Sequence, residues 1–141
     1  MNGMKRMAAL AAGLALGVTV LVAAPGSAAD GDRCVGEDVK RCIRVQQSGD
    51  TYFAHAGIED LQGEYQVRVS HIELQRWNGS AWVTLKSNSD ADGWFNDRDA
   101  GNTGTYGCTS GSHSFRAKAE FHWQGPRDGG EVMYTDKFAP C

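Results

Sequence analysis

The sequence predicts an all-β fold: a small antiparallel β-sandwich of immunoglobulin-like size, with six or seven strands and two disulfides. Residues 114–123 alternate strictly between polar and apolar side chains, as a strand with one buried face does. Asn78-Gly79 lies between two apolar runs and is typical of a hairpin turn. Beyond residue 29, no stretch repeats apolar residues at helical spacing for three turns.

Residues 1–29 have the pattern of a secretory signal peptide. Lys5 and Arg6 precede an apolar run that ends in small residues at 25–29. We expect cleavage after Ala29, which leaves one domain over residues 30–141. A membrane anchor is the alternative, because the run reaches the lower length limit of a spanning helix, but no basic cluster follows it.

The length and charge exclude several function classes. The chain has 141 residues, 14 basic and 17 acidic; the cut removes two of the basic residues, so the acidic excess grows from three to five. An acidic domain is unsuited to nucleic acid or anionic lipid, so we expect neither as a partner. The domain is also too short for a doubly wound nucleotide-binding fold or an eight-fold barrel.

The four cysteines all follow the signal: Cys34, Cys42, Cys108 and Cys141. An even number in a small exported domain predicts two disulfides. Three connectivities are open. We favour the pairing of nearest neighbours, Cys34 with Cys42 and Cys108 with Cys141. The spacings do not fit a zinc site.

Strands are expected at 42–47 and 51–56, and a long one at 65–77. The apolar parity of the long strand switches near Ser70 and His71, which predicts a bulge or a strand that passes from one layer to the other. A two-residue turn at Asn78-Gly79 would then pair apolar residues with one another across the hairpin. It would place Leu74 opposite Val83 and Ile72 opposite Leu85.

The same register predicts a candidate binding surface. It makes Trp77 and Trp82 diagonal neighbours on the solvent side of the hairpin, together with Glu73, Gln75 and Thr84. Aromatic rings beside hydrogen-bonding groups suit a sugar ring or a protein partner, so Trp77, Trp82 and Gln75 are candidate binding residues. The alternative is an aromatic pair that only steadies the hairpin.

Residues 87–111 are rich in Asp, Asn, Gly, Ser and Thr and predict a long connection. Within it, residues 88–99 nearly fit the twelve-residue calcium loop, with glycine at the sixth position. The candidate ligands are Asn88, Asp90, Asp92, Asn96 and Asp99. The last ligand is shorter than the usual glutamate and the flanks are not helical, so the alternative is a solvated turn region.

The end of the chain predicts a hairpin, with a strand at 115–123, a loop at 125–130 and a final strand. Val132, Tyr134 and Phe138 would share one face of the final strand, and Met133, Thr135 and Lys137 the other. No residues form a catalytic set, so we expect no enzyme. Adjacent Ser112 and His113 would point apart, and His113 and His122 would lie on opposite faces of one strand.

The chain as a whole resembles the small exported proteins of actinobacteria such as Streptomyces. The features shared are an Ala-rich signal, a short domain, four cysteines and a cysteine as the last residue. That group includes inhibitors of serine proteases and of α-amylase. Residues 123–125 with Arg127, Tyr134, Phe138 and Cys141 resemble the final hairpin of the subtilisin-inhibitor family. The spacing differs and that family's reactive loop has no counterpart, so no inhibitory residue is carried over.

The leading interpretation is a secreted, extracellular, non-enzymatic protein that binds a glycan or a protein. One alternative is an inhibitor of an extracellular hydrolase, with Arg127 at the tip of the 125–130 loop as a binding residue. Another is a cell-surface structural protein stabilised by calcium; apart from calcium, no cofactor is expected. The sequence leaves the partner and the oligomeric state open.

Overall fold

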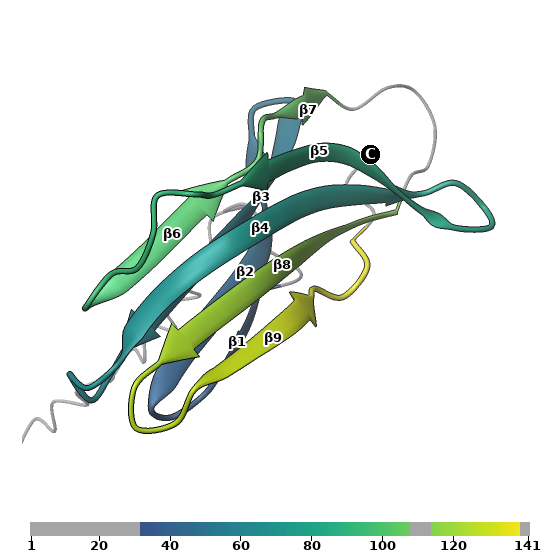
Figure 1. Cartoon of the computed structure of the whole chain (residues 1–141). Coiled ribbons are helices and arrows are strands. Elements are labelled where there is room, and N and C mark those ends of the chain that lie inside the picture. The colour runs from purple at the N-terminus through teal and green to yellow at the C-terminus, as the bar shows by residue number, and fades with distance from the viewer. Residues whose placement is uncertain (1–31, 108–113, 139–141) are drawn as a thin grey trace, which may run out of the picture.

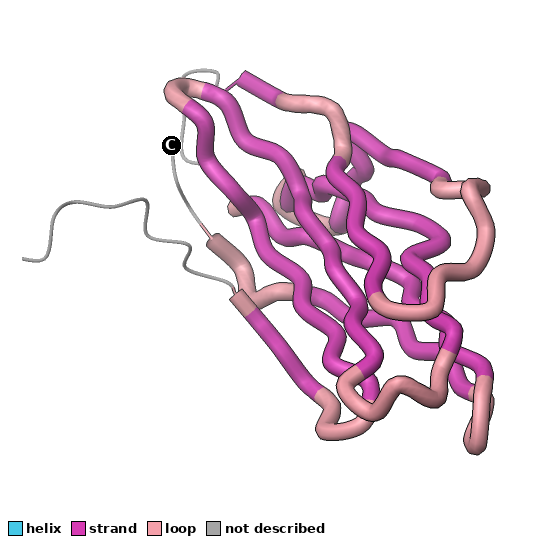
Figure 2. Tube along the Cα trace, turned by 90° about the vertical axis from the view of Figure 1, so that its left-hand side faces the viewer, coloured by secondary structure: helices cyan, strands magenta, loops and turns pink. Residues whose placement is uncertain are grey.

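The computed structural model describes residues 32–107 and 114–138, and within them it contains nine β-strands and no helix (Figure 2). The all-β prediction is confirmed, with nine strands in place of six or seven. The strands are β1 (Arg33–Val35), β2 (Val39–Ser48), β3 (Thr51–Asp60), β4 (Gln66–Trp77), β5 (Trp82–Ser89), β6 (Arg98–Asn102), β7 (Tyr106–Gly107), β8 (Phe115–Gln124) and β9 (Gly129–Tyr134). The described part of the chain has no helix that could span a membrane.

Two antiparallel sheets lie face to face (Figure 1). One has the order β1-β2-β3-β6, with β7 also paired to β3, and the other has the order β5-β4-β8-β9. Alternate residues of both sheets point inward and form a single core. The largest fully buried side chains are Phe115, Phe121, Ile43, Ile58, Ile72, Leu74, Val67 and Val69.

A disulfide joins the first two strands. Cys34 and Cys42 stand opposite each other on β1 and β2 and are bonded, as predicted. The predicted partners Cys108 and Cys141 lie outside the described residues. So do the predicted signal peptide at 1–29 and the Ser112-His113 pair.

The long strand β4 changes face through a bulge at the predicted place. Its pairing with β8 shifts between Val69 and His71. Because one residue is added on β4, Val69 and Ile72 both point into the core despite their opposite parity. The prediction of a bulge near Ser70 is confirmed.

The predicted two-residue turn after β4 is wrong. Residues 78–81 form the turn, because the side-chain Oδ1 of Asn78 accepts hydrogen bonds from the backbone N–H groups of Ser80 (2.9 Å) and Ala81 (2.8 Å). This side-chain closure favours a longer loop over the tighter hairpin. A second bulge, between Leu74 and Gln75, then moves Leu74 opposite Lys86.

This register also corrects the expected pairing of Val83 and Leu85. Val83 lies opposite Arg76 and is exposed, and Ile72 lies opposite Asn88. Leu85 is the extra residue at the second bulge, and it still packs partly against the core.

The predicted long connection at 87–111 contains β-strands, although its polar composition does not indicate them. It holds the end of β5 and the short strands β6 and β7, which both pair with β3. Phe95 also forms an isolated bridge with Val67 on β4. Tertiary pairing therefore orders residues of low strand propensity. Together with β1, the strands β6 and β7 account for the higher strand count.

The last strand alternates as predicted up to Thr135, and Phe138 departs from the expectation. Met133 and Thr135 are buried, while Val132 and Tyr134 point outward and are exposed. Phe138 does not share their face, because β9 ends at Tyr134 and Phe138 bridges to Phe115 at the edge of the core. The hairpin of β8 and β9 is confirmed.

Candidate functional site

Trp77 and Trp82 form a cross-strand pair at the end of the β4–β5 hairpin. They lie directly opposite each other, where the sequence predicted diagonal neighbours. Their ring centroids are 5.5 Å apart and the ring planes are tilted by 58°. Trp77 remains 39% exposed, so part of its ring is open to a partner.

Arg116 on β8 links this pair to the far edge of the sheet. Its guanidinium carbon lies 4.3 Å from the ring centroid of Trp82 on β5 and 4.3 Å from that of Tyr134 on β9. Its Nε donates a hydrogen bond to Oε1 of Gln75 at 2.8 Å. We call Trp77, Trp82, Arg116 and Tyr134 the aromatic face.

Sequence reasoning missed Arg116 and Tyr134 as members of this surface. The alternation in β8 does place Arg116 on the polar side, but only the strand order β5-β4-β8-β9 brings it between Trp82 and Tyr134. That order joins strands far apart in the chain, so local periodicity carries no sign of it.

Beside the aromatic face, Glu73 is the centre of a polar network. Its carboxylate accepts hydrogen bonds from the side chains of His71 (2.9 Å), Gln75 (2.6 Å), Thr84 (2.7 Å) and Lys118 (3.1 Å). Burial alone would raise the pKa of Glu73, but these hydrogen bonds lower it from 4.5 to about 2. The carboxylate is therefore ionised at all ordinary pH values. We call this group the Glu73 network.

The network corrects one expectation about the hairpin face. Glu73 and Gln75 do share a face with the tryptophans, but both are buried and not solvent-facing. Gln75 donates to Glu73 and accepts from Arg116, so both ends of its amide are occupied. Gln75 thus holds the guanidinium of Arg116 in place.

Arg127 lies away from this surface. Arg116 is near the start of β8, whereas Arg127 is in the turn after its end, so the two arginines are at opposite ends of one strand. Arg127 lines a hollow of about 310 Å³ with Tyr65, Trp123 and Arg41 among others. Within this hollow Arg41 is fixed over the Trp123 ring at 4.6 Å and ion-paired to Glu131 at 2.9 Å.

Three of the five predicted calcium ligands come together. Each of Asp90, Asp92 and Asp99 has a carboxylate oxygen within 4.8 Å of the others. A hydrogen bond with Asp90, then slight burial and the charges of the other two, raise the pKa of Asp92. Burial and the charge of Asp90 raise that of Asp99, although its carboxylate accepts the N–H groups of Val69 and Ala100. The cluster disfavours its own full ionisation.

The other two predicted ligands have different partners. The Asn88 side chain donates to the backbone carbonyl of Asn102 at 2.9 Å. The side-chain oxygen of Asn96 accepts from Gln66 at 3.0 Å. The five predicted oxygen donors of residues 88–99 therefore do not surround a single site. The bridge between Phe95 and Val67 holds the middle of this segment against β4.

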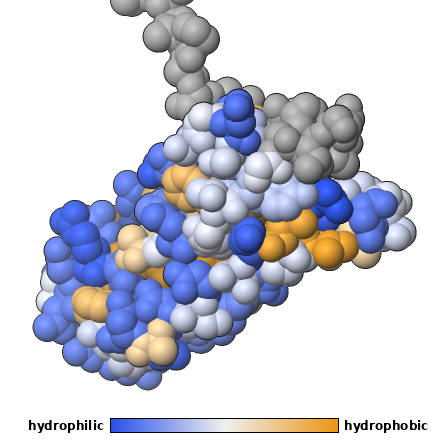
Figure 3. All heavy atoms as spheres, turned by 90° about the horizontal axis from the view of Figure 1, so that it is seen from above, coloured by the Kyte–Doolittle hydropathy of each residue, from blue (hydrophilic) through white to orange (hydrophobic). Residues whose placement is uncertain are grey.

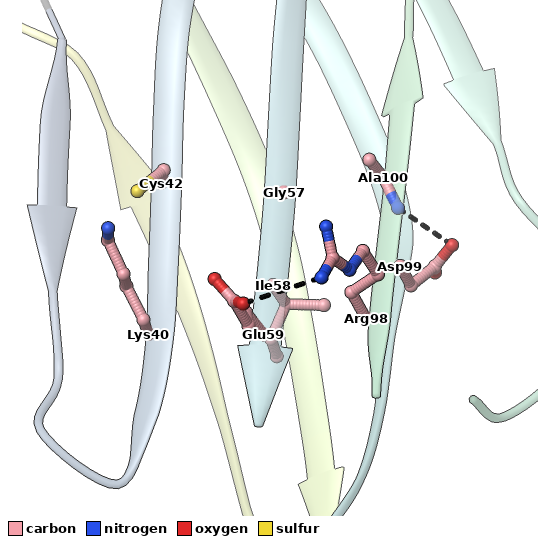
Figure 4. Close-up of a pocket in the computed structure, with 8 residues that line it drawn as sticks. All are labelled: Lys40, Cys42, Gly57, Ile58, Glu59, Arg98, Asp99 and Ala100. Carbon is pink, nitrogen blue, oxygen red and sulfur yellow. Dashed lines mark hydrogen bonds and ion pairs between the residues drawn. The ribbon is translucent and has the colours of Figure 1, made fainter. Parts of the chain in front are cut away.

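A second hollow, of about 170 Å³, lies on the outer face of the other sheet (Figure 4). Its floor is Gly57 in the middle of β3, flanked by Cys42 and Ala100 on the neighbouring strands. Figure 4 shows Arg98 and Glu59 joined at one end, where the closest nitrogen and oxygen are 3.8 Å apart. Sequence reasoning did not single out this hollow.

Exposed hydrophobic residues also distinguish the aromatic face. Seen from above, the described surface is mostly hydrophilic, and its hydrophobic residues form small separate areas (Figure 3). Among the described residues the exposed large hydrophobics are Leu61, Trp77, Val83, Trp94, Val132 and Tyr134. Four of these, Trp77, Trp94, Val132 and Tyr134, lie on the outer face of the β5-β4-β8-β9 sheet, where Trp94 stacks on Arg68 at the far end of β4 from Trp77. Such grouping is more informative than single exposed side chains.

Comparison with protein families and curated proteins identifies no relative, so the proposed function rests on the geometry of the site. No protein-family model matches the chain, and no curated protein matches it.

Proposed function

We propose that the protein is a secreted, non-enzymatic binding protein whose aromatic face holds an extracellular glycan. One observation carries the proposal: the partly open ring of Trp77 lies beside Trp82, Arg116 and Tyr134 on one outer sheet face. This surface is a platform and suits an extended partner better than a small enclosed ligand. The two ends of a sugar chain can continue past it on either side.

The chemistry of the aromatic face fits a saccharide. An indole ring packs against the C–H groups of a sugar, and neighbouring polar groups bond to its hydroxyls. The Glu73 network fixes the side chains beneath the face, so little conformational freedom is lost on binding. Glu73 itself is engaged by four donors and ionised at ordinary pH, which supports a holding role better than proton transfer.

The proposed location rests on two features. The Cys34–Cys42 disulfide is consistent with an oxidising compartment. The pattern of residues 1–29 is that of an export signal. A protein held outside the cell meets cell-wall and environmental polysaccharides, which are the partners proposed here.

A second candidate function is favoured by the Asp90, Asp92 and Asp99 cluster. Three carboxylates within 4.8 Å of one another provide hard oxygen donors of the kind that calcium prefers. A bound cation would relieve the repulsion that raises the pKa of Asp92 and Asp99. In this second proposal, calcium stabilises the segment between β5 and β6. Calcium binding there is compatible with glycan binding on the aromatic face.

Co-sedimentation tests the proposed function. The purified, oxidised protein is mixed with insoluble cell wall, chitin or cellulose, and the supernatant is assayed for depletion. Trp77→Ala is compared with Trp94→Ala, which removes a tryptophan of nearly equal exposure (39% against 38%) from another part of the surface. We expect depletion of the wild type and of Trp94→Ala, and its loss in Trp77→Ala.

The contrary outcomes lead to the alternatives. Equal depletion of all three proteins would place binding elsewhere than on the aromatic face. If all three stay in the supernatant, a protein partner replaces the glycan, and inhibition of extracellular proteases or amylases with an Arg127→Ala control becomes the next assay.

A further inference from the structure

We propose that the glycan recognised by the aromatic face carries a carboxylate, and that the guanidinium of Arg116 receives it. This inference rests on the proposed function and names the ligand class of the same site. The shared chemistry is a sugar carboxylate, which is found in the uronic acids of polysaccharides and on the acidic amino sugars of bacterial cell walls.

The first observation is that Arg116 is a cation without a carboxylate partner. Among the described residues, no Asp or Glu oxygen lies within 4.0 Å of its nitrogens. The nearby charge of Glu73 is already matched by Lys118, whose Nζ is 3.1 Å from Oε1. Arg116 thus leaves one positive charge in excess around the Glu73 network. A single anionic group on a ligand would balance it.

The second observation is that Arg116 is held in place before any ligand arrives. The side chain contacts Trp82 and Tyr134, each at 4.3 Å, and Nε donates to Gln75. Gln75 is itself fixed by Glu73 at 2.6 Å. A mobile surface arginine loses side-chain conformational entropy when it binds a ligand. Arg116 has already lost that entropy on folding.

The third observation concerns the donors that remain. Nε is occupied by Gln75, and within residues 32–107 and 114–138 the two terminal nitrogens of Arg116 donate to no protein acceptor. A guanidinium presents such nitrogens as a planar fork, which matches the two oxygens of a carboxylate. Burial lowers the pKa of Arg116, yet an arginine remains charged in proteins.

These observations together separate Arg116 from Arg41. Arg41 also lies over a tryptophan, but its Nε is ion-paired to Glu131 and its Nη1 donates to the Val39 carbonyl. Arg41 is therefore satisfied within the protein. Arg116 offers the same kind of stacked cation with its charge still available, next to the open ring of Trp77.

A matched pair of ligands tests the inference: an oligogalacturonate and its methyl ester, which keeps the sugar rings and removes the charge. Affinities of the purified wild type are measured for both, and for a soluble peptidoglycan fragment as the second source of the carboxylate. We expect the wild type to bind at least one of the two acids about tenfold more tightly than the ester. In Arg116→Met the ratio of acid to ester affinity should fall to about one.

Two variants separate the fork from the charge. Arg116→Lys keeps the positive charge and loses the planar fork, and we expect most of the preference for the acid to disappear. Arg98→Lys makes the same exchange on the other sheet and should keep the wild-type ratio. Thermal unfolding of each variant confirms that it is folded.

The outcomes distinguish this inference from the proposed function. If the wild type binds the acids and the ester equally, or if Arg116→Lys keeps the full preference, the inference is overturned while glycan binding stands. Binding of neither acid also overturns it, and glycan binding is then decided by the co-sedimentation with neutral polymers.

Discussion

Trp77 and Trp82 stand directly opposite each other on β4 and β5, with 5.5 Å between their ring centroids. Asn78 sets this distance, because its side chain closes a four-residue turn and so pairs the residues that flank it. The second ring also packs on the Arg116 guanidinium. One turn residue therefore determines how the aromatic face, which spans four strands, is assembled.

We expect the Glu73 network to contribute to stability in a pH-dependent way. The folded-state pKa of about 2 lies below the ordinary value of 4.5, so the contribution is present above pH 4.5 and is lost as the pH falls toward 2. Glu73→Gln should lower the free energy of unfolding by about 2 kcal/mol at pH 7 and by much less near pH 2. Denaturant unfolding at both pH values measures this.

The control for that prediction is Glu120→Gln. Glu120 forms a similar contact with His122, but its side chain is 43% exposed. Its substitution should change the free energy of unfolding by less than about 0.5 kcal/mol. Equal losses in the two variants would mean that the Glu73 hydrogen bonds add nothing beyond a surface contact.

Gly57 offers a stabilising substitution. It lies within β3, its φ is not positive, and an added Cβ would be 3.9 Å from the nearest atoms, which is ordinary contact. Gly57→Ala should raise the free energy of unfolding by about 0.5–1 kcal/mol, because alanine restricts the unfolded chain. Thermal and denaturant unfolding both measure the change.

Gly36 provides the contrasting case. Its φ is +99°, and a Cβ there would lie 2.1 Å from the Val39 carbonyl oxygen. Gly36→Ala should therefore destabilise the protein. A loss of stability in Gly57→Ala as well would show that the hollow above β3 is not the open space described.

Calcium should stabilise the segment between β5 and β6 if the Asp90, Asp92 and Asp99 cluster binds it. The pKa of Asp92 and of Asp99 is raised, so without a cation the folded state becomes less stable as the pH rises above 3.8. At pH 7 we expect about 1 mM calcium to raise the melting temperature by roughly 5 °C relative to chelator.

The variant Asp92→Asn tests whether the carboxylate of Asp92 takes part in calcium binding. Removing one charge relieves the repulsion, so the variant should melt higher than the wild type in chelator, and it should lose the calcium response. An unchanged melting temperature of the wild type with calcium would reject the site.

Much of the fold could be predicted from local pattern. The alternation of 115–123, the bulge in β4 and the Cys34–Cys42 pairing depend on residues close in the chain, and all are present. The register of the β4–β5 hairpin could not be predicted in this way, because the Asn78-Gly79 sequence is compatible with more than one turn. The strands β6 and β7 were missed because their order comes from pairing with β3.

The candidate site divides in the same way. The shared face of Trp77, Trp82 and Gln75 follows from strand periodicity. The contribution of Arg116 and Tyr134 follows from strand order, and the burial of Gln75 follows from the side chains that cover it. The acidic segment kept three of its five predicted ligands together, because the Phe95–Val67 bridge sets a path that composition does not reveal.

The central claim, that a glycan binds on the aromatic face, is tested most directly by following the indole N–H resonances in an NMR titration. The protein has four tryptophans, and each gives its own signal. We predict that a bound glycan shifts the signals of Trp77 and Trp82, while those of Trp94 and Trp123 stay in place as internal controls. Shifts confined to Trp94 or Trp123, or no shift with any glycan, would contradict the account.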